Sequence, residues 1–178
     1  MKRKSRGLRG SLLEAIINES NNEYRENSLA LIQKVPTPIT PIEIDESTRH
    51  ITLAYFDSKS TVDYIGVVQG IPVAFDAKEC KSDTFPLQNI HEHQMKFMGD
   101  FENQDGIAFF IIYFTHKDIY YYLKYDKALY FWNRMLEGGR KSFKTEELDE
   151  EFFFRAENGY FLPYLNMIQK DLEQRKGT

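Results

Sequence analysis

The chain has only one cysteine, Cys80, among its 178 residues, and a lone thiol excludes an intramolecular disulfide. A single cysteine also suits a reducing compartment, so the cytoplasm is the default expectation. No apolar run reaches the roughly 18 residues of a membrane-spanning helix, and we therefore expect no membrane partner. The basic start of the chain is not followed by the apolar stretch of a secretory signal.

Positive charge is in deficit overall, since the net charge is −4, yet the basic residues are unevenly distributed. Residues 1–10 carry five basic side chains, Arg6 and Arg9 among them, and no acidic one, which leaves −9 for the rest of the chain. A basic arm on an acidic body is a common arrangement for contacting phosphates. The plain alternative is a solvated terminal tail.

Proline is concentrated in one stretch, residues 36–50, which has three of the six prolines at its start. These prolines exclude a central strand, and the stretch alternates apolar with polar residues. Because its isoleucines need burial, we expect a protruding arm that returns to the main sheet through a strand at 50–56. At the end of that strand, Tyr55 and Phe56 either join the core, the more common outcome for at least one of them, or stack on an unpaired base.

The most informative stretch is residues 61–78, TVDYIGVVQGIPVAFDAK, in which β-forming residues flank a Gln-Gly pair. A tight turn at this pair makes a hairpin and places Asp63 opposite the 76 region. Asp76 and Lys78 are two residues apart, so both point to the same face of the sheet. Two carboxylates and a lysine therefore converge at the open end of the hairpin.

This set of side chains is suited to hold a hard divalent cation for phosphodiester hydrolysis. Mg²⁺ takes one or two carboxylates, keeps several waters and accepts phosphate oxygens from a substrate. The metal acidifies a bound water and polarises the phosphate, while a nearby lysine orients that water or neutralises the developing charge. The alternative is a surface Asp-Lys pair at the end of a strand, because D-x-K tripeptides also occur by chance.

Two predicted helices bring further polar residues toward this site. Residues 7–27 have apolar residues at helical spacing, and Glu14 lies beside the apolar stripe, where it is either solvated or directed into a site. Residues 88–103 form the second helix, and Gln94, near its start, is either a surface residue or a partner for a phosphate or water. A His-x-His pair in the same helix lacks Cys or His partners at ligand spacing, so zinc is discounted.

The rest of the chain alternates strands, helices and loops. Asp126 is expected to cap a helix that ends at a Gly-Gly pair and has an apolar face formed by Ala128, Leu129, Trp132 and Leu136. In the basic loop that follows, Arg140 and Lys141 either contact a phosphate or only close the helix. The other expected elements are a short strand at 29–35, a loop at 79–87, a strand buried on both faces at 107–114, its hairpin partner or an edge strand at 118–125, and a terminal helix at 162–176.

Taken in order, several motifs resemble those of the RecU family of Holliday junction resolvases: G-L-R-G, K-V-P-T-P-I, S-T-V-D-Y-I-G-V, F-D-A-K-E, F-P-L-Q-N-I-H-E-H-Q and G-G-R-K-S. The resemblance spans residue 7 to about residue 142. It implies a restriction-endonuclease-like α/β fold, a central mixed sheet flanked by helices, with the family's protruding stalk at about residues 36–55. It also implies a homodimer that binds four-way branched DNA in recombination and repair and cuts two strands symmetrically, using Mg²⁺ or Mn²⁺. The length of 178 residues and the hydrophobic content of 42% favour one domain over residues 1–178.

The resemblance also assigns roles to individual residues. It implies that Asp63 and Asp76 bind the metal, that Lys78 is the catalytic lysine, and that Glu14 and Gln94 are the helix glutamate and glutamine of the site. The family usually has Glu where this chain has Asp76. Because aspartate is one methylene shorter, we expect the metal to sit closer to the strand or to bind more weakly.

Candidate DNA contacts come from the basic arm, the stalk and its flanks, and the basic loop: Arg6, Arg9, Lys34, Tyr55, Phe56, Thr61, Arg140 and Lys141. A strand-exchange recombinase or a branch-migration motor is a further expected partner. Two other interpretations stay open: an accessory protein that binds branched DNA without cutting it, and a nuclease of the same fold that cuts linear duplex. The stalk favours junctions, because a plain duplex cutter has no need of it.

Overall fold

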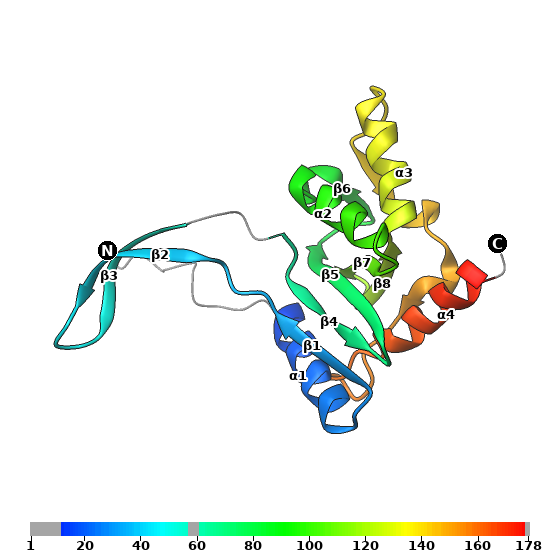
Figure 1. Ribbon diagram of the computed structural model, residues 1–178. Helices are drawn as coiled ribbons and strands as arrows, with labels where there is room; N and C mark the ends of the chain where they lie inside the picture. The colour runs from blue at the N-terminus through cyan, green and yellow to red at the C-terminus, as the bar shows by residue number, and fades with distance from the viewer. Residues whose placement is uncertain (1–11, 57–60, 177–178) are drawn as a thin grey trace.

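The computed structural model describes residues 12–56 and 61–176, which form a sheet with helices on both faces and a long two-stranded arm (Figure 1). The helices are α1 (Leu12–Glu26), α2 (Glu92–Glu102), α3 (Tyr125–Leu136) and α4 (Tyr164–Lys176). In spatial order, the strands of the sheet are β1 (Ala30–Lys34), β4 (Tyr64–Val68), β5 (Ile71–Cys80), β7 (Ile107–Phe114), β8 (Ile119–Lys124) and β10 (Phe153–Phe154). Only β5 and β7 pair in parallel within these described residues, so the expected mixed sheet flanked by helices is confirmed.

Successive residues of β5 face the two helical layers in turn. Phe75 stacks on Tyr64 at a ring-centroid distance of 4.7 Å and contacts Tyr164 of α4. Tyr24 of α1 packs edge-on against the same Tyr164, so α1 and α4 cover this face of the sheet. Asp76, the next residue of β5, points to the other face and meets α2. The aromatic contacts, each worth about 0.5–1.5 kcal/mol beyond simple burial, fix the strand that carries this aspartate.

The predicted hairpin and the predicted central strand are both confirmed. β4 pairs with β5 in the expected register, with Tyr64 opposite Phe75. Gln69 and Gly70 have φ angles of 49° and 87°, the positive values that a two-residue hairpin turn requires and that glycine adopts without strain. β7 is buried along its whole length, and β8 is its antiparallel partner.

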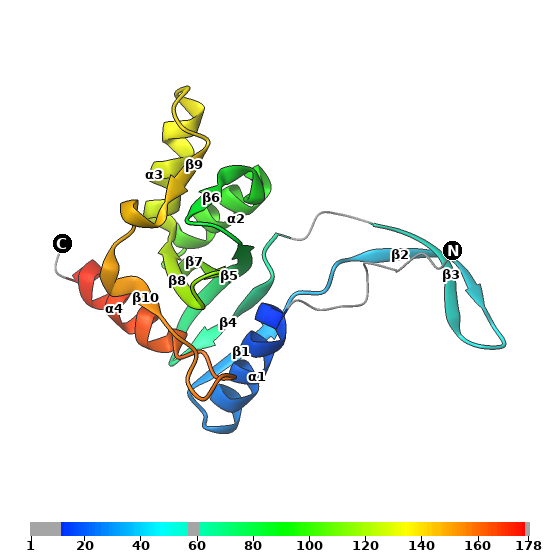
Figure 2. The same cartoon turned by 180° about the vertical axis from the view of Figure 1, so that it is seen from behind.

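The expected stalk is present as an arm, but the expectation that it returns to the main sheet with its isoleucines buried is wrong. β2 (Ile39–Asp45) and β3 (His50–Phe56) pair with each other, and the arm extends away from the sheet and its helices (Figures 1 and 2). The side chains of Tyr55 and Phe56 are 51% and 76% exposed, so neither joins the core. No second layer within the described residues covers the arm, which leaves its apolar residues open to solvent.

Three local expectations also need correction. The loop expected at 79–87 instead continues β5 and then forms β6 (Thr84–Pro86), which pairs with β9 (Ser142–Lys144). Asp126 is not an N-cap, because α3 already begins at Tyr125. The buried face of α3 includes Phe131, which stacks on Phe143, whereas Leu136 is 68% exposed.

The remaining elements are short or terminal. The helix expected at 88–103 is divided into one 3₁₀ turn and α2, and the terminal helix is confirmed as α4. The 3₁₀ turns are η1 (Leu87–Asn89), η2 (Thr145–Glu147) and η3 (Glu150–Phe152). The start of the first predicted helix at residue 7 lies outside the described residues. None of the helices within residues 12–56 and 61–176 has the length and apolar character needed to cross a membrane.

Candidate active site

The two aspartates meet at the open end of the β4–β5 hairpin. Asp63 directly precedes β4, and its Oδ2 accepts a hydrogen bond of 3.1 Å from the backbone N–H of Ala77 in β5. The Asp63 side chain is therefore held across the ladder, beside the strand segment that carries Asp76 and Lys78. This is the arrangement that the hairpin register predicts.

Asp76 is fully buried and has a partner at each carboxylate oxygen. The ammonium Nζ of Lys78 lies 2.6 Å from its Oδ1, and the Nε2 of Gln94 donates a hydrogen bond to its Oδ2. The Oε1 of Gln94 accepts a hydrogen bond of 3.1 Å from the backbone N–H of His91 at the start of α2, which fixes the orientation of the amide. The sequence left Gln94 as either a surface residue or a partner for a phosphate or water, and the structure joins it, together with Lys78, to Asp76.

Burial raises the pKa of the Asp76 carboxyl to about 7, from an ordinary value of 3.8. The charge of Lys78 opposes this rise, and the negative charge of Asp63 adds to it. The metal-free protein therefore holds Asp76 partly protonated near neutral pH. A bound cation would favour the ionised form and lower this pKa.

Glu14 lies in the first turn of α1, and its carboxylate forms an ion pair with Lys34. The Nζ of Lys34 is 2.5 Å from its Oε2. Burial first, and then the negative charges of Glu14, Asp63 and Asp76, raise the pKa of the Tyr64 hydroxyl, so all three carboxylates act electrostatically on one phenol. Within residues 12–56 and 61–176, however, no group of three or more His, Cys, Asp or Glu side chains is placed to hold a metal.

The donor set of the two aspartates fits a hard divalent cation. The buried Oδ1 of Asp76 accepts no hydrogen bond of good geometry, although the ammonium of Lys78 is 2.6 Å away. A buried carboxylate oxygen in this state retains a lone pair that a cation can take. Mg²⁺ and Mn²⁺ both accept oxygen ligands, and Mg²⁺ needs only one or two carboxylates when water and phosphate complete its shell. The residues that would hold the metal are Asp63 and Asp76.

The candidate DNA contacts are spread over the molecule. Tyr55 and Phe56 lie on the exposed arm, and Thr61 lies in the chain between β3 of the arm and β4 of the sheet. Arg140 is ion-paired with Glu147 at 3.0 Å, and the exposed Lys141 follows it in the chain, beyond the end of α3. Figure 1 shows α3 and the arm in different parts of the molecule. Arg6 and Arg9 lie outside the described residues. The structure therefore does not gather these candidates into one surface.

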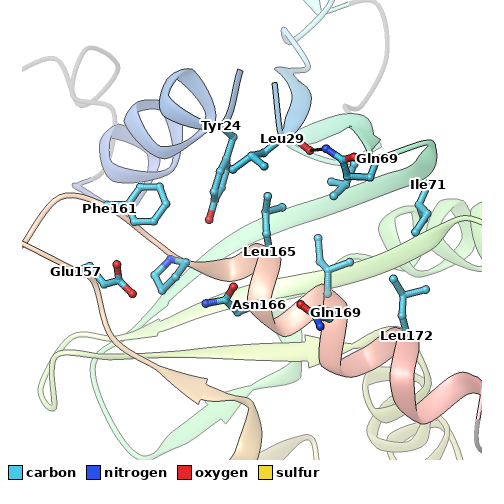
Figure 3. Close-up of a pocket in the computed structure, with 13 residues that line it drawn as sticks. Tyr24, Leu29, Gln69, Ile71, Glu157, Phe161, Leu165, Asn166, Gln169 and Leu172 are labelled. Carbon is cyan, nitrogen blue, oxygen red and sulfur yellow. Dashed lines mark hydrogen bonds between the residues drawn. The ribbon is translucent and has the colours of Figure 1, made fainter. Parts of the chain in front are cut away.

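The hollows among the described residues were not predicted from the sequence, and two of them bear on where the site lies. One, of about 460 Å³, adjoins Lys78 and is also lined by Gln88, Asn89 and His91. The motif F-P-L-Q-N-I-H contains these three residues, and it was the only available signal. The other, of about 420 Å³, is mainly apolar and lies between α1, α4 and the hairpin turn, with Gln69 and Leu165 in its wall (Figure 3). It shares no lining residue with the candidate site.

Residues 8–170 match the family model described as RecU, Recombination protein U. The Holliday junction resolvase RecU of Bacillus licheniformis is 43% identical over 153 residues, which cover 84% of this chain and 76% of that protein. The protein of the same name from Bacillus subtilis (strain 168) is 40% identical over 168 residues, covering 91% and 80%. The one from Pediococcus pentosaceus is 40% identical over 172 residues, covering 94% and 86%.

One solved structure that resembles the chain is that of Hjc, a Holliday junction resolvase from Archaeoglobus fulgidus. The TM-score is 0.42 at 12% sequence identity, over 77% of this chain and 88% of that chain. A likeness at this level is too distant to carry an argument.

The raised pKa of Asp76 predicts how the Asp76→Asn variant behaves without metal. Between about pH 4 and pH 7 the folded protein binds a proton at Asp76 that the unfolded chain has released, so wild-type stability falls as pH rises through this window. Asparagine does not titrate, so the variant does not lose stability in this way. The free energy of unfolding of the variant minus that of wild type should therefore increase by roughly 2–4 kcal/mol as pH rises over the same range. Urea unfolding in EDTA at pH 4, 6 and 8 measures it. A difference between the two proteins that does not change with pH would contradict the assignment.

Proposed function

We propose, from the premise that this chain belongs to the RecU family of recombination proteins, that it is a metal-dependent, structure-selective endonuclease that resolves four-way DNA junctions by paired symmetric cuts. The observation that carries the proposal is the buried Asp76, held between Lys78 and Gln94 beside Asp63. The names of its relatives support the choice of junctions as substrate. We place its action in the cytoplasm, with the DNA of a bacterial cell.

The side chains divide the chemistry of hydrolysis among them. Bound by Asp63 and Asp76, Mg²⁺ or Mn²⁺ would acidify water and polarise the scissile phosphate. Lys78 keeps its ammonium at the mouth of the site, with 18% of its side chain exposed, where it can stabilise the charge that develops on the phosphate. Gln94 holds the Asp76 carboxylate in one orientation through its hydrogen bond to Oδ2.

A homodimer is part of the proposal. Symmetric cleavage of two strands needs two sites, and one chain supplies one pair of metal-binding aspartates. The arm also exposes large apolar side chains along both of its strands: Ile39, Ile42, Ile44, Ile51, Leu53, Tyr55 and Phe56. A contiguous exposed apolar surface of this kind is typical of an interaction site. The arm is therefore suited to contact a second copy, the unpaired bases at a junction centre, or both. Contact with a recombinase or a branch-migration motor stays a prediction.

Replacing one metal ligand tests the catalytic assignment. The Asp63→Asn variant keeps a similar shape and removes a carboxylate charge, so junction cleavage should fall by at least about 100-fold while junction binding in EDTA stays within about two-fold of wild type. Single-turnover cleavage and a gel-shift titration measure the two quantities. Retained cleavage at unchanged binding would contradict the role of Asp63.

Replacing an arm aromatic tests the contact with branched DNA. If Tyr55 stacks on an unpaired base, the Tyr55→Ala variant should bind a four-way junction about 5- to 100-fold more weakly and bind linear duplex almost as wild type does. Tyr160→Ala is the matched control, because Tyr160 and Tyr55 are both 51% exposed. Equal losses of affinity for junction and duplex, or equal effects of the two variants, would contradict a role of the arm in junction recognition.

A further inference from the structure

The hollow of about 460 Å³ beside Lys78 adjoins the candidate active site through this lysine. The ammonium of Lys78 lies 2.6 Å from Oδ1 of Asp76, so the same side chain belongs to the hollow and to the buried carboxylate. The end of β5 forms one wall of the hollow, and the segment between β6 and α2, with Gln88, Asn89 and His91, forms the other. A phosphodiester group bound beside Lys78 therefore has this hollow on one of its sides.

The wall opposite β5 has polar side chains that suit a sugar-phosphate backbone. Gln88 is exposed and Asn89 is half-buried, and each side-chain amide has two N–H donors and one acceptor oxygen. Glu79 is the only acidic residue among the described residues that line the hollow, and strand alternation directs its side chain to the face opposite Lys78. Neutral and positive donors of this kind hold the phosphate and sugar oxygens of DNA.

The basic loop after α3 is held against this wall by the pairing of β6 with β9. The backbone N–H of Leu87, the residue before Gln88, donates a hydrogen bond of 3.0 Å to the carbonyl oxygen of Lys141. The buried rings of Phe85 and Phe143 stack at a centroid distance of 5.0 Å and fix the same pair of strands. Lys141 therefore has a fixed backbone position next to the wall of the hollow.

The structure distinguishes the two basic residues of this loop. Arg140 pairs with Glu147 at 3.0 Å, and Glu147 also pairs with Arg134 of α3 at 2.6 Å, so Arg140 serves to hold the loop to the helix. Lys141 is exposed and takes part in no ion pair with another described residue. Its ammonium is therefore available to a phosphate that lies beside the hollow.

We propose that this hollow is a subsite for the backbone of the cleaved DNA strand, next to the scissile phosphate at Lys78. Gln88 and Asn89 contact the sugar and phosphate that adjoin the scissile group, and Lys141 binds the phosphate beyond them. The inference rests on the function proposed above and names the surface that the strand follows on one side of the site. Because these contacts reach the backbone and not the base edges, they strengthen binding equally for every junction sequence.

An added negative charge in the hollow tests the contact with DNA. The Asn89→Asp variant should bind a four-way junction about 10-fold more weakly at low salt, because the new carboxylate repels the phosphates. Asn166→Asp is the matched control, since it adds the same charge at an exposed position of α4 in the other hollow. Its affinity should stay within about two-fold of wild type. A gel-shift titration in EDTA measures both affinities and prevents the new carboxylate from acting through a metal. Equal losses for the two variants would overturn the subsite.

Removing the charge of Lys141 tests the far end of the subsite in a protein whose hollow is unchanged. The Lys141→Gln variant should reduce the slope of log K against log salt concentration by about one, the contribution of one phosphate contact. Lys117→Gln is the matched control and should retain the wild-type slope, since Lys117 is 47% exposed and paired with Asp83. A scan of single neutral methylphosphonates around the cut position should find one that weakens binding by wild type but not by Lys141→Gln.

The outcomes separate this inference from the proposed function. An unchanged salt slope for Lys141→Gln, or a methylphosphonate scan identical for the two proteins, would overturn the subsite. Either result leaves the proposed function intact as long as wild type cuts the junction and Asp63→Asn does not. A wild-type protein that neither binds nor cuts a four-way junction would overturn both.

Discussion

The burial of Asp76 is the constraint on which the rest of the site depends. A carboxylate without contact to water costs several kcal/mol unless charged and hydrogen-bonding groups compensate it. Here Lys78 compensates one oxygen from the same strand, and Gln94 compensates the other from α2. Because Gln94 is itself fixed by the backbone of His91, the start of α2 and the end of β5 must keep a constant relative position. Despite this compensation, burial raises the pKa of Asp76 to about 7, so the carboxyl is close to half-protonated at neutral pH. A bound cation can then shift it readily to the ionised form.

The rest of the fold keeps the start of α2 and the end of β5 in this relative position. On the opposite face of β5, the stacked rings of Tyr64, Phe75 and Phe109 join three strands through one aromatic layer. The parallel pairing of β5 with β7 places the strand that carries Asp76 and Lys78 next to one that is buried throughout. The arm is attached to this rigid part through the hydrogen bond between Val35 and Asp63. The arm is therefore connected directly to the backbone of one of the two aspartates that are proposed to bind the metal.

Local sequence signals predicted the site better than they predicted the arm. The Gln-Gly turn, the i, i+2 spacing of Asp76 and Lys78 and the apolar run of β7 each determine a geometry by strand periodicity alone, and the structure agrees. The alternation of isoleucines in the arm signals burial, but among the described residues no surface covers them. Asp126 looked like a cap because its type favours that position, yet α3 begins one residue earlier. The pairing of Glu14 with Lys34 joins distant segments, and no spacing rule reveals it.

Cleavage of a labelled four-way junction beside a linear duplex of the same sequence tests the central claim most directly. The assay uses Mg²⁺, Mn²⁺ or EDTA, with the cut positions mapped on all strands. A junction resolvase should make paired, symmetric nicks in the junction alone, with either metal, and EDTA should abolish them. Equal cutting of both substrates, or tight binding of the junction with no cutting in either metal, would contradict it.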